Sequence, residues 1–177
     1  MTGWRRVVTP FGPIGLEATA AGLRQVWLPP TIPPDFATMP GGPADEAVLD
    51  DAERQLREYA DGERREFDVP LDWSLAPGGF TGEALRALAA IGYGEVESYG
   101  EIAARLGRPG AARAVGTACA RNPLALVVPC HRVVRANGMG LYGGGEAMKR
   151  ALLAHEFATS GLDAPPWWRG ARSGGAS

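Results

Sequence analysis

Cys130 and His131 lie side by side, and both are residue types that perform nucleophilic chemistry. They follow the apolar run LALVV and Pro129. Proline fixes its own φ and favours an extended conformation before it, so we expect Cys130 at a rigid bend. A thiol becomes a nucleophile when a base or a positive charge stabilises its thiolate, and His131 and Arg132 offer one of each. A lone buried cysteine is nevertheless more often structural, so both interpretations are open from this pattern.

A third group is needed to orient the imidazole in such a site. The segment KRALLAHE supplies Glu156, which we expect at the end of a helix that starts near Gly145. Because adjacent side chains often diverge, a bridging water is the expected link between the thiol and the histidine. We expect no metal and no cofactor, since adjacent cysteine and histidine are not a usual pair of zinc ligands. The soft ligands of the chain are Cys119, Cys130, His131 and His155.

Two short helices separated by a turn are predicted before this cysteine. In SYGEIAARLG, Ser98 is followed three residues later by Glu101, which is the pattern of a helix capping box. GRPG interrupts the helix, and AARAVGTACARN forms a second helix that ends at Asn122-Pro123. The pair indicates a helix-turn-helix, although any pair of helices shares this pattern.

The second of these helices is unusually thin. Most of its residues are Ala, Gly or Thr, and its long side chains are chiefly Arg113 and Arg121. A major-groove reader normally carries long polar side chains, whereas a thin helix can approach a groove only about 6 Å wide. The pattern therefore predicts minor-groove contact with little sequence specificity. A small-residue helix packed inside the domain is an equally good interpretation of the same residues.

The first part of the chain indicates a small α+β support unit without a catalytic constellation. The segment GPIGLEAT alternates apolar and other residues, and GLRQVWLP follows after a short turn. Together they predict a hairpin of two strands. Residues 29–43 are rich in Pro and Gly and predict a loop. Residues 44–60 then predict an amphipathic helix. Its expected buried stripe comprises Val48, Ala52, Leu56 and Tyr59.

The segment EFDVPLDW predicts another strand, SLAPGG a linker, and residues 80–91 a helix. We therefore expect one domain over residues 1–75 and a second over residues 76–160. The tail, residues 161–177, is expected to be partly disordered, with Trp167 and Trp168 packed back on the domain.

Composition and charge narrow the class of protein. The chain is 45% hydrophobic and 21% charged, as in ordinary soluble proteins. The net charge of −2 hides an asymmetry: residues 1–98 carry 8 basic and 16 acidic side chains, whereas residues 99–150 carry 8 basic and 2 acidic ones. This asymmetry favours a polyanionic partner, and a solvated basic face is an equally good explanation. The N-terminus MTGWRRVVTP lacks a signal-peptide core, so we expect a cytoplasmic protein without membrane contact.

Several motifs together resemble one known family. PCHRVV, the downstream YGGG and LLAHE, and the upstream SYGEIAARLGRPGAARAVGTACARNP resemble the O6-alkylguanine-DNA alkyltransferases, also called methylated-DNA–protein-cysteine methyltransferases. The match is continuous from about Gly94 to Glu156. The resemblance implies an α+β fold, in which a ribonuclease-H-like α/β domain precedes a mostly helical domain with a winged-helix-like helix-turn-helix. It implies double-stranded DNA containing O6-alkylguanine, and by extension O4-alkylthymine, as the partner of a monomer that associates with the nucleoid.

The resemblance also implies roles for the reacting residues. Cys130 accepts the alkyl group irreversibly, in a single turnover, after the damaged nucleotide is flipped out of the duplex. His131 takes the thiol proton through a water and Glu156 holds the histidine. Asn122 braces the turn before the cysteine.

Further roles concern the base and the DNA. Tyr99 helps rotate the nucleotide and then donates its hydroxyl to the base, while Arg113 fills the gap left in the stack. The Val133 carbonyl accepts from the exocyclic amine of guanine. Other residues expected in the base pocket are Tyr142, Gly143 and Gly144, and those expected on DNA are Ala112, Gly116, Thr117 and Arg121.

Some residues depart from the family pattern. Gly143 stands where serine is common, and Cys119 and Ala125 stand where bulkier residues often line the pocket, which favours a roomy site. Two alternatives remain: an alkyltransferase-like lesion sensor that does not transfer the group, and a cysteine hydrolase. Sensors of that kind carry tryptophan or alanine at the position of Cys130, and a hydrolase would need an oxyanion hole.

Overall fold

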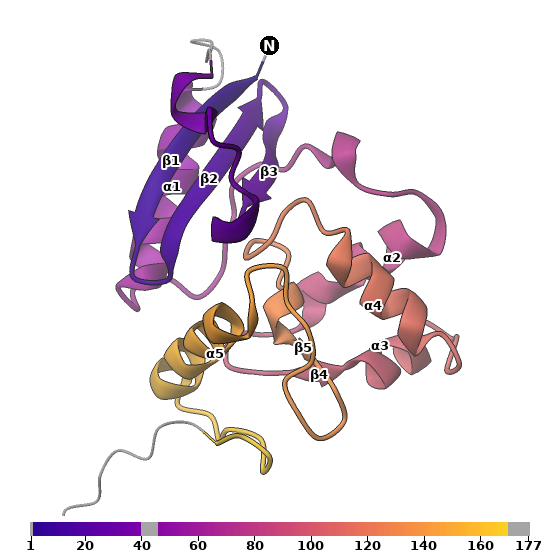
Figure 1. Cartoon of the computed structure of the whole chain (residues 1–177). Coiled ribbons are helices and arrows are strands. Elements are labelled where there is room, and N and C mark those ends of the chain that lie inside the picture. The colour runs from indigo at the N-terminus through magenta and orange to yellow at the C-terminus, as the bar shows by residue number, and fades with distance from the viewer. Residues whose placement is uncertain (1, 40–45, 170–177) are drawn as a thin grey trace, which may run out of the picture.

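The computed structural model describes residues 2–39 and 46–169, which form a mixed α/β fold (Figure 1). Three antiparallel strands, β1 (Gly3–Thr9), β2 (Gly12–Thr19) and β3 (Gly22–Trp27), lie in the order β1-β2-β3. The predicted hairpin of β2 and β3 is confirmed. β1 was not predicted, because two adjacent arginines interrupt its alternation. One of them, Arg5, pairs with three carboxylates of the following helix, a contact that the local sequence does not reveal.

The helix α1 (Glu46–Ala60) covers one face of this sheet (Figure 1). Three of the four predicted stripe residues, Ala52, Leu56 and Tyr59, are buried, together with Leu49 and Gln55. Val48 is only partly buried, at the edge of the core. Residues 44–45 of that prediction, and residues 40–43 of the predicted loop, lie outside the described part of the chain. The described part of the predicted loop, residues 29–39, contains two single 3-10 turns, Pro29–Thr31 and Phe36–Thr38.

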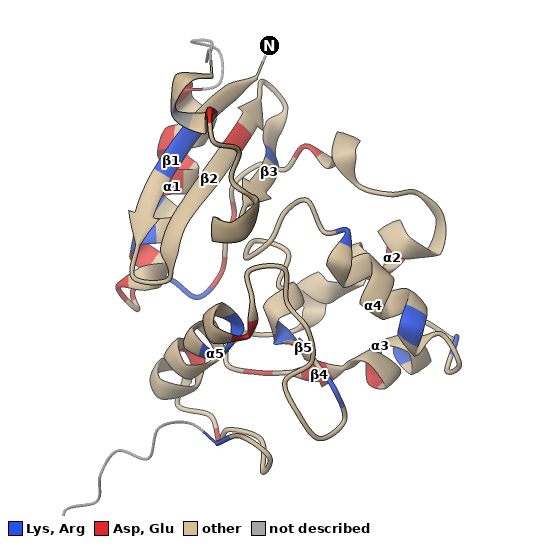
Figure 2. Cartoon of the chain, viewed as in Figure 1, with Lys and Arg blue, Asp and Glu red and all other residues tan. Residues whose placement is uncertain are grey.

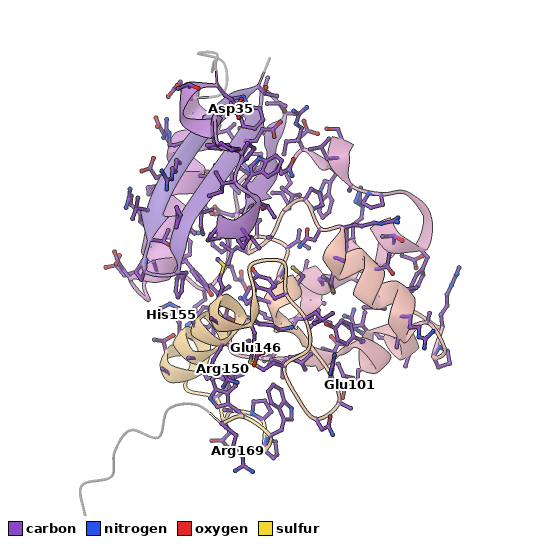
Figure 3. The ribbon with its side chains drawn as sticks, viewed as in Figure 1. Asp35, Glu101, Glu146, Arg150, His155 and Arg169 are labelled. Carbon is purple, nitrogen blue, oxygen red and sulfur yellow. The ribbon has the colours of Figure 1, made fainter. Side chains whose placement is uncertain are left out.

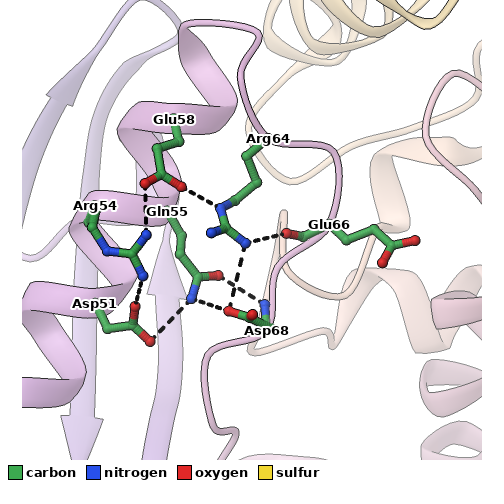
Figure 4. A network of polar contacts seen from close by, with 7 residues as sticks. All are labelled: Asp51, Arg54, Gln55, Glu58, Arg64, Glu66 and Asp68. Carbon is green, nitrogen blue, oxygen red and sulfur yellow. Dashed lines mark hydrogen bonds and ion pairs between the residues drawn. The ribbon is translucent and has the colours of Figure 1, made fainter.

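The strand predicted for EFDVPLDW is wrong. This segment makes one isolated parallel bridge, Leu23 with Leu71, before a 3-10 turn at Trp73–Leu75. Pro70 has no backbone N–H to donate to a ladder. The backbone N–H of Asp68 instead donates to the Gln55 side chain at 2.9 Å, within a polar network that fixes the segment on α1 (Figure 4).

The helices of the second part agree closely with the sequence pattern. They are α2 (Gly79–Ala87), extended by the 3-10 turn Leu88–Ala90, then α3 (Tyr99–Arg105) and α4 (Ala112–Ala120). The capping box is confirmed: Ser98 accepts from the Glu101 N–H at 3.1 Å, and the Glu101 carboxylate accepts from the Ser98 N–H at 2.7 Å. α4 packs against both α2 and α3, so one face of the thin helix is buried while Arg113 and Thr117 on the other are exposed.

The segment LALVV is buried, as expected, but it is not a regular strand. It makes isolated bridges, Val26 with Leu124 and Ala125 with Val128, and Leu126 has a left-handed φ of 72°. Cys130 begins a single 3-10 turn, Cys130–Arg132, directly after Pro129. The short strand β5 (Val133–Val134) then pairs in parallel with β4 (Glu97–Ser98).

The last helix, α5 (Glu146–Ser160), continues four residues past Glu156, so the prediction that Glu156 ends the helix is wrong. Gly161, with a left-handed φ of 77°, ends it instead. Trp167 and Trp168 pack against Val134, Leu153 and Phe157, as predicted. Residues 170–177 of the expected disordered tail lie outside the described residues. No helix in residues 2–39 and 46–169 is long and apolar enough to cross a bilayer.

Candidate active site

The turn that presents Cys130 is braced by one side chain. The Asn122 amide donates from Nδ2 to the Val128 carbonyl at 2.9 Å, and its Oδ1 accepts from the Leu124 N–H at 3.0 Å. Both bonds replace ladder contacts that the irregular segment lacks. The position of the thiol therefore depends on Asn122, which is the arrangement expected for that residue.

Glu156 is fully buried and accepts hydrogen bonds from four groups. Its Oε2 lies 2.6 Å from both His131 Nε2 and the Tyr59 hydroxyl. Its Oε1 accepts from Arg132 Nε at 2.7 Å and from the Gly94 N–H at 3.1 Å. Burial favours the neutral carboxyl, but the Arg132 charge and the hydrogen bonds from His131 and Arg132 outweigh burial and hold the pKa of Glu156 well below its usual value. The group is thus a fixed carboxylate.

His131 is oriented by this carboxylate. Its ring is fully buried, and burial lowers its pKa even though Glu156 is adjacent, so the imidazole is neutral. A neutral ring that donates from Nε2 to Glu156 presents Nδ1 as a base. Nδ1 has no hydrogen-bond partner among the described residues. This nitrogen is therefore the atom of His131 that can receive a proton.

Cys130 is 5% exposed, and burial raises the pKa of its thiol. The Asn122 side chain and the Lys149 ammonium oppose that increase only in part. Lys149 is itself fully buried and donates from Nζ to the carbonyls of Val133 and Leu141, at 2.5 and 3.0 Å. Burial lowers the pKa of Lys149 to about 8. The resting thiol is protonated, so a base is needed to make it a nucleophile.

A cavity of about 500 Å³ opens onto Cys130. Such a volume lies within the range of about 300–1,000 Å³ found for small-molecule sites. Among the predicted site residues, the lining comprises Tyr99, Ala112, Arg113, Gly116, Cys130, Tyr142 and Gly143. α4, the turn after Pro129 and the loop before α5 therefore meet at one cavity. The Tyr142 hydroxyl is buried there without a hydrogen-bond partner among the described residues.

The other predicted residues lie elsewhere. Arg121 and Asn122 line an adjacent cavity of about 350 Å³, which also reaches Cys130. Val133 is fully buried and its carbonyl already accepts from Lys149. Gly144 is not part of the cavity lining, and a Cβ there would lie 2.4 Å from Met148 Sδ. Thr117 is exposed, and its hydroxyl donates to the Arg113 carbonyl at 3.1 Å.

Four contributors to the site were not predicted from sequence. Tyr59 was assigned only to the buried stripe of α1, and Gly94 only marked the start of the family resemblance. Arg132 was expected to act by charge and not as a hydrogen-bond donor to Glu156. Lys149 carried no signal beyond its position in a basic segment. None of these contacts has a local sequence signature, since Tyr59 and Glu156 are 97 residues apart.

The charge asymmetry has a counterpart in space. In the ribbon of Figure 2, many acidic positions lie on α1 and the strands, and basic positions lie on α4 and on the loops beside it. Arg113 lies on α4 and lines the cavity that holds Cys130. The positive part of the molecule is thus the part that contains the reactive thiol.

A family model described as the DNA binding domain of 6-O-methylguanine DNA methyltransferase matches residues 79–158. This match covers α2 to α5 and includes Cys130, His131 and Glu156. The class that the fold and site define is therefore that of the DNA alkyltransferases.

Curated and solved relatives extend the similarity to most of the chain. The methylated-DNA–protein-cysteine methyltransferase of Mycobacterium tuberculosis is 42% identical over 165 residues, which are 92% of this chain and 97% of the relative. A crystal structure of the M. tuberculosis O6-methylguanine methyltransferase matches with a TM-score of 0.79 over the same shares. A second crystal structure, of M. tuberculosis OGT in complex with DNA, is 40% identical in sequence and matches with a TM-score of 0.78. The match covers 89% of this chain and 94% of the chain in that structure.

The chain belongs to the methylated-DNA–protein-cysteine methyltransferase family. The family, the class of enzyme and the alkyl-transfer function predicted from the sequence are confirmed. Neither the sensor nor the hydrolase alternative is favoured by these relatives. The roles of the individual site residues rest on the geometry described above.

Proposed function

We propose that this protein repairs O6-alkylguanine in duplex DNA by transferring the alkyl group to Cys130. The observation that carries this proposal is the position of Cys130 between the cavity lined by Arg113 and the buried His131–Glu156 pair. DNA as the partner is supported by the matched DNA-binding domain and by the relative in complex with DNA.

The chemistry follows from the atoms that are free to react. The thiol proton passes through a water to His131 Nδ1, and the resulting imidazolium is stabilised by Glu156. The thiolate attacks the alkyl carbon, a carbon–sulfur bond forms, and the bond from that carbon to O6 breaks. The electron pair of that bond stays on guanine, which takes a proton from the Tyr99 hydroxyl. The imidazolium returns its proton through water to the tyrosinate, so the thiol proton ends on guanine. Because a thioether is a poor leaving group, each molecule reacts once.

The helix pair α3–α4 would bring DNA to this site. α4 is narrow on its exposed side, and its small residues permit close approach to the minor groove. Arg113 would fill the stack after the nucleotide leaves, which offsets an eversion cost of about a few kcal/mol. The sugar–phosphate backbone of the DNA would be contacted by Ala112, Gly116, Thr117 and Arg121. Few side chains of α4 could contact base edges, which suits a protein that must inspect DNA of any sequence. O4-alkylthymine is a further candidate lesion.

We also propose the finer fold description. The sheet β1-β2-β3 with α1 corresponds to a ribonuclease-H-like support domain. α2, α3, α4 and the β4–β5 pair correspond to a winged-helix-like domain, with the boundary near residue 75. Its support is the element order and the separate sheets, one in each part.

Intact mass spectrometry after mixing with an O6-methylguanine duplex tests the proposal. We expect one methyl group per molecule, located on Cys130 by peptide mapping, and no gain in Cys130→Ala. Burial raises the pKa of the other thiol, Cys119, to about 12, so that residue should stay unmodified. A methyl group on Cys119, or tight binding without any gain of mass, would refute the assignment of Cys130.

A further inference from the structure

A second cavity, of about 430 Å³, lies against the loop 135–141. The same loop borders the cavity that opens onto Cys130, which we call the base cavity. We call the second cavity the tail cavity, because the segment after α5 forms one of its walls. Its principal side chains are Arg135 of the loop, Glu146 and Arg150 of α5, and Trp167, Trp168 and Arg169 of that segment. Nothing in the alkyl-transfer chemistry uses this cavity.

The segment after α5 is held in place by specific contacts. Glu146 and Arg150 of α5 and Arg169 of this segment can be followed in Figure 3. The Trp168 ring packs edge-on against Phe157 with centroids 5.0 Å apart. The Arg150 guanidinium lies 5.4 Å from the Trp168 centroid and donates to the Arg169 carbonyl at 3.1 Å. These contacts place Arg150 of α5 against the backbone of the tail at Arg169.

The chemistry of the tail cavity suits an anion that carries a flat ring. Three arginines and one glutamate line it, and the Glu146–Arg150 pair is loose at 3.6 Å between exposed side chains. Such an exposed pair is worth little and is easily exchanged for another anion. Trp167 is only half-buried and its indole lines the cavity. Proteins that bind single strands combine two elements: positive side chains that follow the phosphates, and aromatic side chains on which bases stack. The tail cavity contains both.

The tail cavity adjoins the base cavity. Arg135 and Leu141 line both, so the loop 135–141 is the wall between them. Arg135 is exposed, and the loop is closed by the bond from its N–H to the Gly138 carbonyl at 2.9 Å. A strand that leaves the base cavity over this loop meets Arg150 and Arg169 next.

We propose that the tail cavity binds the DNA strand beside the everted nucleotide, with Arg150 and Arg169 on phosphates and Trp167 stacked on a neighbouring base. The inference rests on the proposed function, because that function places the everted nucleotide in the adjoining cavity. It extends the DNA contact beyond α3 and α4 to the end of the chain.

The phosphate contacts are tested by the salt dependence of DNA binding, measured by fluorescence anisotropy. Arg150→Gln and Arg169→Gln should each reduce the slope of log affinity against log salt by about 0.7–0.9. Arg150→Lys should retain the wild-type slope. The matched control is Arg57→Gln, which also removes an exposed arginine paired with a glutamate one turn earlier, but on α1. Unchanged slopes in both glutamine variants, or an equal change in Arg57→Gln, would overturn the proposal.

The stacking contact is tested with Trp167→Ala. Affinity for a duplex whose lesion lies beside a single-stranded overhang should fall about five-fold or more, while affinity for a blunt duplex without an everted base should not change. Equal affinities of variant and wild type for the overhang substrate would contradict stacking. Methyl transfer to Cys130 is measured in parallel. If wild type transfers normally and these variants bind normally, only the tail cavity proposal fails; if wild type gains no methyl group, the proposed function fails.

Discussion

Replacing Tyr59 by phenylalanine would remove one donor from Glu156 while keeping the aromatic ring. The lost bond joins a fully buried hydroxyl to a buried carboxylate at 2.6 Å. A hydrogen bond to a charged group is worth about 1.5–3 kcal/mol. For a chain of this length, 1 kcal/mol shifts Tm by about 2–4 °C, so Tm should fall by about 3–12 °C.

The effect on the reaction follows from the shared oxygen. The Tyr59 hydroxyl and His131 Nε2 both contact Glu156 Oε2. Without the hydroxyl, the carboxylate attracts the imidazolium more strongly, which raises the pKa of His131. The acid limb of the rate–pH profile should therefore move to higher pH. We expect single-turnover methyl transfer near neutral pH to slow by about three- to ten-fold, a fraction of the 10²–10⁴ that a whole general base contributes.

Tyr93→Phe is the matched control. Tyr93 packs on Tyr59 with ring centroids 6.0 Å apart, but its hydroxyl contacts Thr159 at 2.7 Å and not Glu156. That variant should lose some stability and keep both the wild-type transfer rate and the wild-type pH profile. Rapid-quench transfer from an O6-methylguanine duplex measures the rate, and anisotropy checks that DNA affinity is unchanged. If Tyr59→Phe lowers Tm yet transfers at the wild-type rate with the same acid limb, Tyr59 only stabilises the fold.

Three further outcomes are expected. Arg113→Ala should lower transfer from duplex DNA far more than transfer from free O6-methylguanine base, and equal losses would remove Arg113 from the eversion step. Lys149→Met should slow alkylation of Cys130 by iodoacetamide, because the ammonium lowers the pKa of that thiol; a wild-type rate by mass spectrometry would contradict this. Burial lowers the folded pKa of His131 below its unfolded value of about 6.5, so the unfolded state binds more protons below that pH. The free energy of unfolding in urea should thus fall as pH decreases below about 6.5, and a constant value down to pH 5 would show that His131 titrates normally.

Local sequence determined several regular elements of this protein. The capping box at Ser98, the alternation of β2 and β3 and the helical stripe of α1 depend on contacts between residues close in the chain, and each is present in the structure. The bend at Cys130 follows likewise from the φ of Pro129. The motifs of the second part were long enough to indicate the family, and hence the thiol that reacts.

Tertiary structure alone decided the rest. Whether EFDVPLDW becomes a strand depends on Gln55 accepting the Asp68 N–H, and whether WRRVV becomes one depends on carboxylates more than 40 residues away. Glu156 was predicted to hold His131, but its other donors, Tyr59, Arg132 and Gly94, come from separate elements. Buried polar groups must find partners wherever packing places them, and packing is a property of the whole chain. For that reason the sequence identified the reactive pair, while the groups that orient it became visible only in the fold.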